Sequence, residues 1–248
     1  METDILSELY AELGRGSPAR LGFTRKAFQM LPELDNPRIL DLGCGQGGPT
    51  LELARLSGGQ VTALDIDQAA IDKLARRAGE EGLSNRVQAV RGSMSDLAFS
   101  WESFDVIWSE GSMWVLGFER ALAEWQRFIR PHGFLVVHEM AWLRPDPPSE
   151  IRNCWQLVYP GIRTASEYVE RVPEHGYHLI GQFALPEDFW WADYYVPMLA
   201  RLGDLRKKYA GDQAAQKVLD KEQQAADLYE KYVKWYGSMF LVMQRAEP

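Results

Sequence analysis

The chain has 248 residues, of which 46% are hydrophobic and 25% charged, a balance typical of one folded domain with some elaboration. Its net charge of -8 argues against nucleic acid as the main partner, because a polyanion selects basic surfaces. The start lacks the basic head of a signal peptide and no long apolar span follows, so we expect a cytoplasmic protein without a membrane segment. Two cysteines give no disulfide framework, and no group of His, Cys, Asp and Glu has the spacing of metal ligands.

Before residue 37, the apolar pattern predicts two helices, over 4–13 and 23–31, separated by a glycine-containing break. From residue 37 onward, short apolar strands alternate with helices through short links. We predict strands over 38–42, 60–65, 86–91, 104–109, 134–138, 178–185 and 239–244, and helices over 49–57, 67–79, 118–129, 150–158 and 164–175. This alternation is typical of an α/β fold with a doubly wound, mostly parallel sheet and helices on both faces.

The alternation is interrupted once, near the end of the chain. Residues 186–236 lie between the last two predicted strands and have a mostly helical pattern rich in Ala, Gln, Lys and Leu. Because predicted core strands flank this segment on both sides, we interpret it as an insertion rather than a second domain. The chain then reads as a single domain: a helical segment over 1–36, a core over 37–185 and 237–248, and the helical insertion over 186–236.

A glycine-rich turn follows the first predicted strand, with the spacing Gly43-x-Gly45-x-x-Gly48. Such a turn lets a ligand approach bare backbone and meet the N–H groups at the start of a helix. The same spacing occurs in dinucleotide-binding proteins, so the glycines alone do not name the ligand. Asp41 precedes the first glycine by two residues, where a carboxylate would repel a pyrophosphate but suits a cationic amine. Asp65 ends the second strand, where a carboxylate commonly binds ribose.

The glycine turn and these two acids together resemble the class I S-adenosylmethionine-dependent methyltransferases, with the likeness covering roughly residues 38–140. The resemblance implies S-adenosylmethionine as the cofactor, a small-molecule methyl acceptor, and a seven-stranded sheet whose last strand is antiparallel. In that family the turn, here Asp41, Gly43, Cys44 and Gly45, holds the methionine end of the cofactor. The acid after the second strand, here Asp65, binds the ribose hydroxyls.

The resemblance also assigns the loop after the third strand to the adenine ring. It places Met94, Ser95 and Asp96 around the adenine, with Asp96 accepting from the adenine amine and Ile66 packing on the ring face. Ser109, at the end of the fourth strand, joins the cofactor side of the site. The alternative for the loop is a simple cap of the next turn.

The methyl acceptor is expected beside the carboxyl ends of the fourth and fifth strands, near the topological switch point. Glu110 follows the fourth strand and His138 ends the fifth, so both are candidate bases. A neutral His138 is the better base near pH 7, whereas Glu110 needs a pKa raised by burial. Trp114 is a candidate pocket wall. A structural role remains open for each of the two candidate bases.

The insertion begins with a dense aromatic segment that includes Trp191 and Tyr195. We expect these rings either to cover the acceptor as a lid, or to attach the insertion to the core or to a second copy in a homo-oligomer. In proteins similar to this one the segment before the core covers the cofactor pocket, which here implicates Tyr10 and the loop over 14–17. Packing of that segment on the sheet edge is equally consistent with the sequence.

Two other functions remain compatible with the glycine turn. The first is a nicotinamide-dependent oxidoreductase, which Asp41 and the inferred antiparallel last strand disfavour. The second is a non-catalytic protein that binds S-adenosylmethionine without transferring its methyl group. The missing catalytic triad does not argue against an enzyme, because the sulfonium already activates the methyl carbon and the protein mainly aligns the acceptor.

Overall fold

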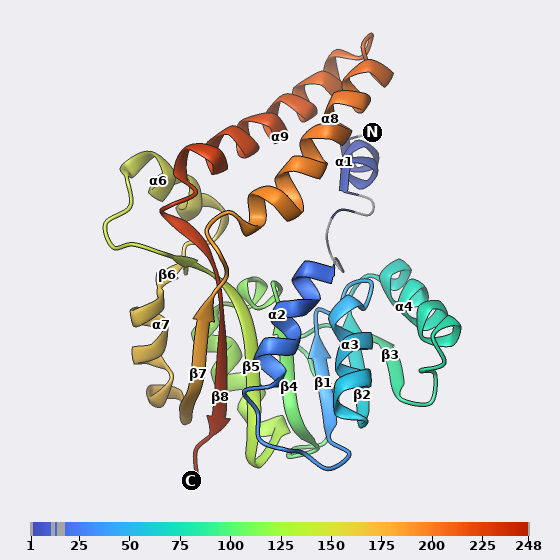
Figure 1. Cartoon of the computed structure of the whole chain (residues 1–248), viewed down its shortest axis with the longest axis vertical. Coiled ribbons are helices and arrows are strands. Elements are labelled where there is room, and N and C mark those ends of the chain that lie inside the picture. The colour runs from blue at the N-terminus through green and yellow to red at the C-terminus, as the bar shows by residue number, and fades with distance from the viewer. Residues whose placement is uncertain (1, 11–12, 14–17, 248) are drawn as a thin grey trace.

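The computed structural model describes residues 2–10, 13 and 18–247, and its core is one mixed sheet (Figure 1). The strands are β1 (Arg38–Leu42), β2 (Gln60–Asp65), β3 (Val87–Arg91), β4 (Phe104–Glu110), β5 (Ile129–Trp142), β6 (Arg163–Thr164), β7 (Tyr177–Ala184) and β8 (Tyr236–Arg245). They follow the order β3-β2-β1-β4-β5-β8-β7, with β6 pairing on β5. All pair in parallel except β8, which runs antiparallel to both β5 and β7. The predicted doubly wound sheet with an antiparallel last strand is therefore confirmed, with the two-residue β6 in addition.

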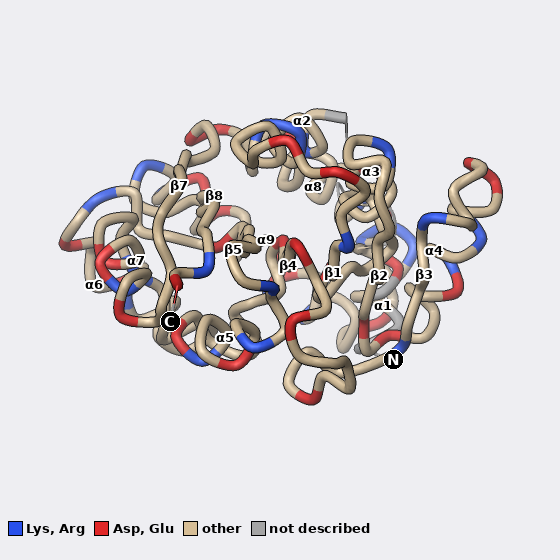
Figure 2. The backbone as a smooth tube through the Cα atoms, turned by 90° about the horizontal axis from the view of Figure 1, so that it is seen from below, with Lys and Arg blue, Asp and Glu red and all other residues tan. Residues whose placement is uncertain are grey.

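Helices cover both faces of this sheet, as the view along the strands shows (Figure 2). On one face lie α2 (Pro18–Phe28), α3 (Gly48–Ser57) and α4 (Gln68–Glu80), and on the other lie α5 (Phe118–Trp125) and α7 (Ala165–Arg171). Side chains alternate between the two apolar layers along each strand, as on β5, where Val136 packs on the α2 face and Val137 on the α5 face. This alternation later decides which polar side chains share a face at the strand ends.

The fifth strand is longer than the sequence pattern predicted, because it begins at Ile129 rather than 134 and continues to Trp142. Its partner β8 also begins earlier than predicted, at Tyr236. The two strands pair over nine positions from Phe134 to Trp142, so each supplies the hydrogen bonds that extend the other. The extension carries β5 past the ends of its parallel neighbours and toward the insertion.

Three helices from opposite parts of the sequence form a separate layer above the strand ends (Figure 1). The insertion supplies α8 (Val196–Lys208) and α9 (Gln213–Tyr232), and the N-terminus supplies α1 (Glu2–Tyr10). Their apolar sides pack into one cluster that includes Leu9, Leu202 and Leu219, and we call these three helices the cap. A further helix, α6 (Ser149–Val158), lies between the cap and the end of β5. Within the part of the chain that the structure describes, no helix is long and apolar enough to cross a membrane.

Candidate functional site

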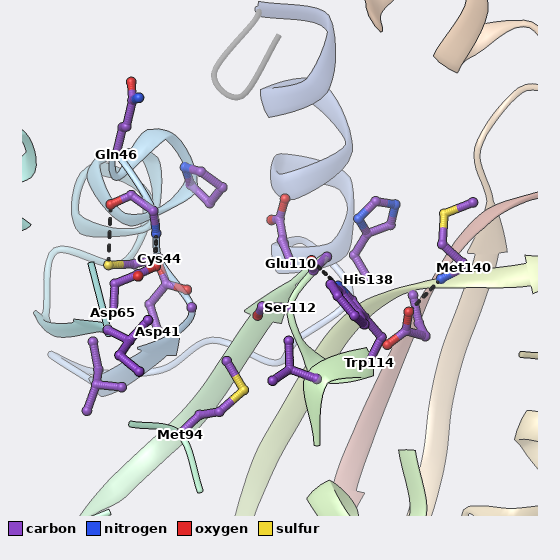
Figure 3. Close-up of a pocket in the computed structure, with 18 of the residues that line it drawn as sticks. Asp41, Cys44, Gln46, Asp65, Met94, Glu110, Ser112, Trp114, His138 and Met140 are labelled. Carbon is purple, nitrogen blue, oxygen red and sulfur yellow. Dashed lines mark hydrogen bonds between the residues drawn. The ribbon is translucent and has the colours of Figure 1, made fainter. Parts of the chain in front are cut away.

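A cavity of about 490 Å³ lies at the carboxyl ends of β1, β2, β4 and β5. Figure 3 shows its labelled residues in two groups, one around the glycine turn and one around the ends of β4 and β5. We call the first group the turn side (Asp41, Gly43, Gly45, Asp65 and Ile66) and the second the aromatic side (Trp114, His138, Met140, Trp190 and Tyr194). Open α/β sheets bind ligands at this edge, because the loops after neighbouring strands diverge there.

The turn side depends on a glycine at its first position. Gly43 has a positive φ of 72°, and a Cβ atom there would lie 2.3 Å from the Cβ and Oγ atoms of Ser112. Ser112 is fixed, because its hydroxyl donates to the carbonyl of Leu42 at 2.7 Å and pairs with the Ser109 hydroxyl at 2.8 Å. Only glycine therefore allows β1 and the loop after β4 to approach so closely. Ser109 is fully buried behind Ser112 and does not border the cavity.

Asp41 is buried at the end of β1 and borders the cavity. Its Oδ2 atom accepts a hydrogen bond of 2.6 Å from the Thr50 hydroxyl on α3. Burial raises the pKa of Asp41 to about 7, although the bond from Thr50 opposes the shift. A cationic ligand group would favour the ionised carboxylate and offset this cost of burial.

Asp65 lies one strand away from Asp41 and connects two turns. Its Oδ2 atom accepts from the Gly45 N–H at 2.8 Å, and its Oδ1 atom accepts from the Asp67 N–H at 2.9 Å. These bonds fix the carboxylate at the cavity edge, where each oxygen keeps a lone pair for a ligand hydroxyl. Next to it, Ile66 is 70% exposed and borders the cavity, as an apolar surface for a flat ring.

The loop after β3 contributes to the cavity with its first residues only. Gly92, Ser93 and Met94 border it, whereas Ser95 and Asp96 are exposed and do not. The Ser95 hydroxyl pairs with that of Ser93 at 2.8 Å, and the Asp96 N–H donates to the Ser93 carbonyl. The two residues therefore stabilise the turn, and the structure does not bring their side chains to the predicted adenine position.

Glu110 and His138 are brought together by the parallel register of β4 and β5. They are direct register partners on the face that carries α2, and Figure 3 shows both side chains pointing the same way. The Oε1 atom of Glu110 accepts from the Thr24 hydroxyl and the Trp108 indole N–H, both at 2.8 Å. Its Oε2 atom, and both ring nitrogens of His138, are buried and form no hydrogen bond within the described structure.

The two side chains differ in how they hold a proton. Burial raises the pKa of Glu110, against the bonds from Trp108 and Thr24 and the charge of Arg20. Burial, helped by the charge of the Arg20 guanidinium, lowers the pKa of His138 to about 3. The imidazole stacks between Phe240, at 4.7 Å between ring centroids, and Trp190, at 6.1 Å. The sequence suggested that His138 is a base near pH 7, but in this environment its pKa is too low for that role.

The aromatic residues of the insertion that border the cavity differ from the two that the sequence suggested. Trp190 and Tyr194 border the cavity, whereas Trp191 and Tyr195 do not. Trp191 and Tyr195 stack instead on Tyr229 of α9, at 6.4 and 4.3 Å between ring centroids. Both pairs are four residues apart, so the spacing alone does not decide which pair faces the cavity. The segment Trp191–Tyr195 forms a π-helical turn. Trp114 is 44% exposed and borders the cavity, as expected.

Three further side chains border the cavity. Arg20 reaches it from α2, with its guanidinium 4.9 Å from the Trp190 ring centroid. Trp190 is anchored by its indole N–H, which donates to the Ser238 hydroxyl at 2.9 Å. Glu139 borders the cavity from β5, on the opposite face to His138. The sequence already places His138 and Glu139 on opposite faces of this strand, so that either can reach the acceptor, but no local pattern connects Arg20 to this site.

Before α2, the described residues of the N-terminal segment reach the cavity only indirectly. The Tyr10 ring stacks at 6.4 Å on Tyr194, which borders the cavity, and the Tyr10 hydroxyl donates to Glu222 of α9. The loop over 14–17, which was expected to cover the pocket, lies outside the described residues. Among the described residues, no group of three or more His, Cys, Asp and Glu could hold a metal ion.

Comparison with known proteins identifies the family. A family model described as a methyltransferase domain matches residues 39–133. YodH of Bacillus subtilis, named an uncharacterized methyltransferase, is 32% identical over 177 residues, which cover 69% of this chain and 73% of that protein. This chain belongs to the class I S-adenosylmethionine-dependent methyltransferases.

Two other similarities show how far the likeness extends. The methyltransferase chain is 28% identical to the sterol 24-C-methyltransferase ERG6A of Gibberella zeae over 141 residues, covering 55% of this chain and 36% of that enzyme. It thus spans about a third of the length of that curated relative. A crystal structure of an S-adenosylmethionine-dependent methyltransferase from Geobacter sulfurreducens, in complex with S-adenosyl-L-homocysteine, aligns over 98% of both chains with a TM-score of 0.81 at 21% identity. This last likeness shows the fold.

The turn side of this methyltransferase fits S-adenosylmethionine, the cofactor of the family. The acids Asp41 and Asp65 complement a ligand with an ammonium, a sulfonium and two ribose hydroxyls. The close approach at Gly43 leaves backbone rather than side chain at the turn. The exposed apolar side chain of Ile66 suits the adenine ring.

Proposed function

We propose that this protein transfers the methyl group of S-adenosylmethionine to a small-molecule acceptor. The observation that carries the proposal is the position of two acids, Asp41 and Asp65, at the ends of adjacent strands on either side of the glycine turn. Family membership and the similarity to a sterol methyltransferase support a small acceptor. The net charge of -8 favours a small acceptor over a nucleic acid. We also propose that the protein is cytoplasmic and that it can form a homo-oligomer.

The residues of the turn side would bind the cofactor in the order of the strands. Asp41, with the backbone of Gly43, Cys44 and Gly45, would hold the methionine end. The Asp65 carboxylate would accept from the ribose hydroxyls, and its bonds to two backbone N–H groups orient it for this. Ile66 and Met94 would pack on the adenine ring. Ser95, Asp96 and Ser109 would support the residues that contact the cofactor without touching it themselves.

Arg20 adds a cation that the cofactor requires. The methionine end carries a carboxylate as well as an ammonium, and Arg20 borders the cavity beside Glu110. We assign the carboxylate to Arg20 and the ammonium to Asp41 and Glu110, because opposite charges in a buried site strengthen one another. These contacts use charged groups that would otherwise be costly to bury.

The chemistry that the bound cofactor supplies is an activated methyl carbon on a sulfonium. The protein must align the acceptor, exclude water and receive a proton where the acceptor loses one. Neither predicted base fits the last role in this scheme, because Glu110 would pair with the cofactor ammonium and the pKa of His138 falls to about 3. His138 would position the acceptor through its unpartnered ring nitrogens.

The acceptor would lie against the aromatic side of the cavity. Trp114, Trp190 and Tyr194 supply apolar surface there. Trp191 and Tyr195, which the sequence suggested for this role, would support it from behind through their stacking on Tyr229. Different rings of this segment would therefore pack on α9 and face the substrate.

The test is a calorimetric titration with S-adenosylmethionine and, in parallel, with NAD. We expect S-adenosylmethionine to bind and NAD not to bind. Asp65→Ala should weaken the binding by about 1–3 kcal/mol, because it removes charge-assisted hydrogen bonds to the ribose. Glu33→Gln, an exposed acid outside the cavity, is the matched control and should bind as wild type does.

Stabilisation by NAD alone would favour the oxidoreductase instead. Unchanged affinity in Asp65→Ala would remove the ribose assignment. Cofactor binding without methyl transfer to any member of a broad acceptor panel would favour a non-catalytic binding protein.

A further inference from the structure

One buried acid at the cavity has no role in the scheme above. Glu139 is 1% exposed and borders the cavity near the end of β5. Its Oε1 atom accepts from the Met140 N–H at 2.8 Å, but its Oε2 atom is buried and forms no hydrogen bond within the described structure. A buried carboxyl oxygen without a partner is costly unless a ligand supplies one.

Glu139 points to the opposite face of the sheet from Asp41 and Glu110, although all three border one cavity. Asp41 bonds to α3 and Glu110 to α2, so both lie on the face that these helices cover. Glu139 lies on the opposite face of β5, next to the buried hydroxyls of Tyr159 and Tyr168. A cofactor held on the turn side therefore leaves this acid for a different ligand.

The charges that border the cavity are unequal. Among the described lining residues are four acids (Asp41, Asp65, Glu110 and Glu139) and a single guanidinium, Arg20, while His138 is neutral. Burial raises the pKa values of Asp41, Glu110 and Glu139, so a positive charge beside each of them favours its ionised form. The cofactor would supply such a charge to the acids on its own face, but not to Glu139. A cationic acceptor supplies both the charge and the hydrogen-bond donor that Glu139 lacks, whereas a neutral or anionic acceptor does not supply the charge.

We propose that the methyl acceptor is an amine, which enters as an ammonium and binds beside Glu139; this rests on the methyl transfer proposed above. Glu139 accepts a hydrogen bond from the ammonium and then takes the proton that the nitrogen must lose before it reacts. The freed lone pair forms the bond to the methyl carbon, and the electron pair of the broken carbon–sulfur bond stays on sulfur. Met140 and Trp114 border the same part of the cavity and would contact the apolar part of the amine.

The experiment compares matched ligands on the protein saturated with S-adenosylhomocysteine, which fills the cofactor position without allowing turnover. Calorimetry measures 2-phenylethylamine, 2-phenylethanol and 3-phenylpropionate, and then the same three head groups on hexyl and cyclohexyl skeletons. We expect the amine of at least one skeleton to bind about tenfold or more tightly than its alcohol and acid. An alcohol or acid that binds as tightly as its amine, or no amine binding on any skeleton, would overturn the proposal.

A variant and its control identify the responsible acid. Glu139→Gln keeps the oxygen that accepts from Met140 and removes the charge, so the preference for amines should fall to about that of a neutral site while S-adenosylhomocysteine affinity stays the same. Glu33→Gln, the exposed control, should retain the preference. Retained amine preference in Glu139→Gln would overturn the assignment. Loss of S-adenosylhomocysteine binding by wild type would instead count against the proposed function.

The pH dependence gives a readout that needs no variant. Burial raises the pKa of Glu139 to about 8, so amine affinity in the saturated wild-type protein should rise between pH 6 and 9 as the carboxylate ionises. Burial also raises the pKa values of Tyr159 and Tyr168 beside it, and these groups stay protonated over that range. Across the cavity, saturating ligand keeps Asp41 and Glu110 in one bound state. A flat profile would contradict the role of Glu139.

Discussion

The two sides of the cavity are built in different ways. The turn side comes from two short segments, residues 41–45 and 65–66, and the backbone fixes most of its geometry. The aromatic side comes from β5, the loop after β4 and the insertion, and its geometry depends on which side chain faces inward at each position. A cofactor shared by a family suits the first arrangement, and an acceptor that differs between family members suits the second.

The largest effect is expected from Gly43→Ala on the turn side. The new Cβ atom would meet Ser112 at 2.3 Å in a backbone with positive φ, so the turn must move. We expect a loss of about 2–4 kcal/mol in the free energy of unfolding and about a hundredfold in cofactor affinity. Urea unfolding and calorimetry measure the two.

Gly45→Ala is the matched control for this change. Gly45 also has a positive φ, of 52°, but a Cβ atom there has no neighbour within 4 Å. Its cost in the free energy of unfolding should be limited to about 1 kcal/mol of backbone strain. Equal losses of stability in the two variants would mean that the contact with Ser112 does not determine the turn.

The second prediction compares one buried ionisable group from each side. In Asp41 the folded pKa is raised to about 7, so the folded protein binds the extra proton and the contribution of this group to stability falls as pH rises from about 4 to 7. In His138 the folded pKa is lowered to about 3, so the unfolded chain binds the extra proton and the contribution of this group rises with pH up to about 6.5. Each full contribution is on the order of 4–5 kcal/mol.

Urea unfolding of wild type, Asp41→Asn and His138→Gln between pH 4 and 8 tests these signs. Relative to wild type, Asp41→Asn should become more stable as pH rises, and His138→Gln should become less stable. Glu33→Gln is again the control, with a curve parallel to wild type. Curves that stay parallel for all variants would mean that neither group is shifted by burial.

The smallest effect separates two neighbouring tryptophans on the aromatic side. Trp190→Ala removes a wall of the cavity and should raise the KM for an acceptor found in the amine panel by about tenfold, because apolar contact is lost. Trp191→Ala removes stacking on Tyr229 and should instead lower the free energy of unfolding by about 1–3 kcal/mol with KM unchanged. Steady-state kinetics and urea unfolding of both variants distinguish the roles. If KM rose in Trp191→Ala and not in Trp190→Ala, Trp191 would face the acceptor, as the sequence suggested.

The difference between the two sides also explains what could be predicted from the sequence. Asp41, Gly43 and Asp65 border the cavity, and their positions could be derived because a strand, a tight turn and a helix determine them locally. The fold followed from the alternation of strands and helices, which a periodic pattern predicts well.

The aromatic side could not be derived in the same way. Trp190 and Tyr194 have the same four-residue spacing as Trp191 and Tyr195, so only the packing of the insertion decides which pair borders the cavity. Arg20 reaches the cavity through the packing of α2 on the core, which is a long-range contact. The pKa of His138 depends on rings from β8 and from the insertion, Phe240 and Trp190. Each of these facts depends on tertiary packing.

The π-helical turn Trp191–Tyr195 has a consequence for how acceptor preference can change during evolution. A helix absorbs a one-residue insertion as a single π turn, and the helix beyond it keeps its packing. Gain or loss of one codon here would exchange the rings that face the acceptor while α8 stayed in contact with α1 and α9. The strands that hold the cofactor would not change. Descendants of one ancestor could thus acquire new substrates through a length change too small to disturb folding.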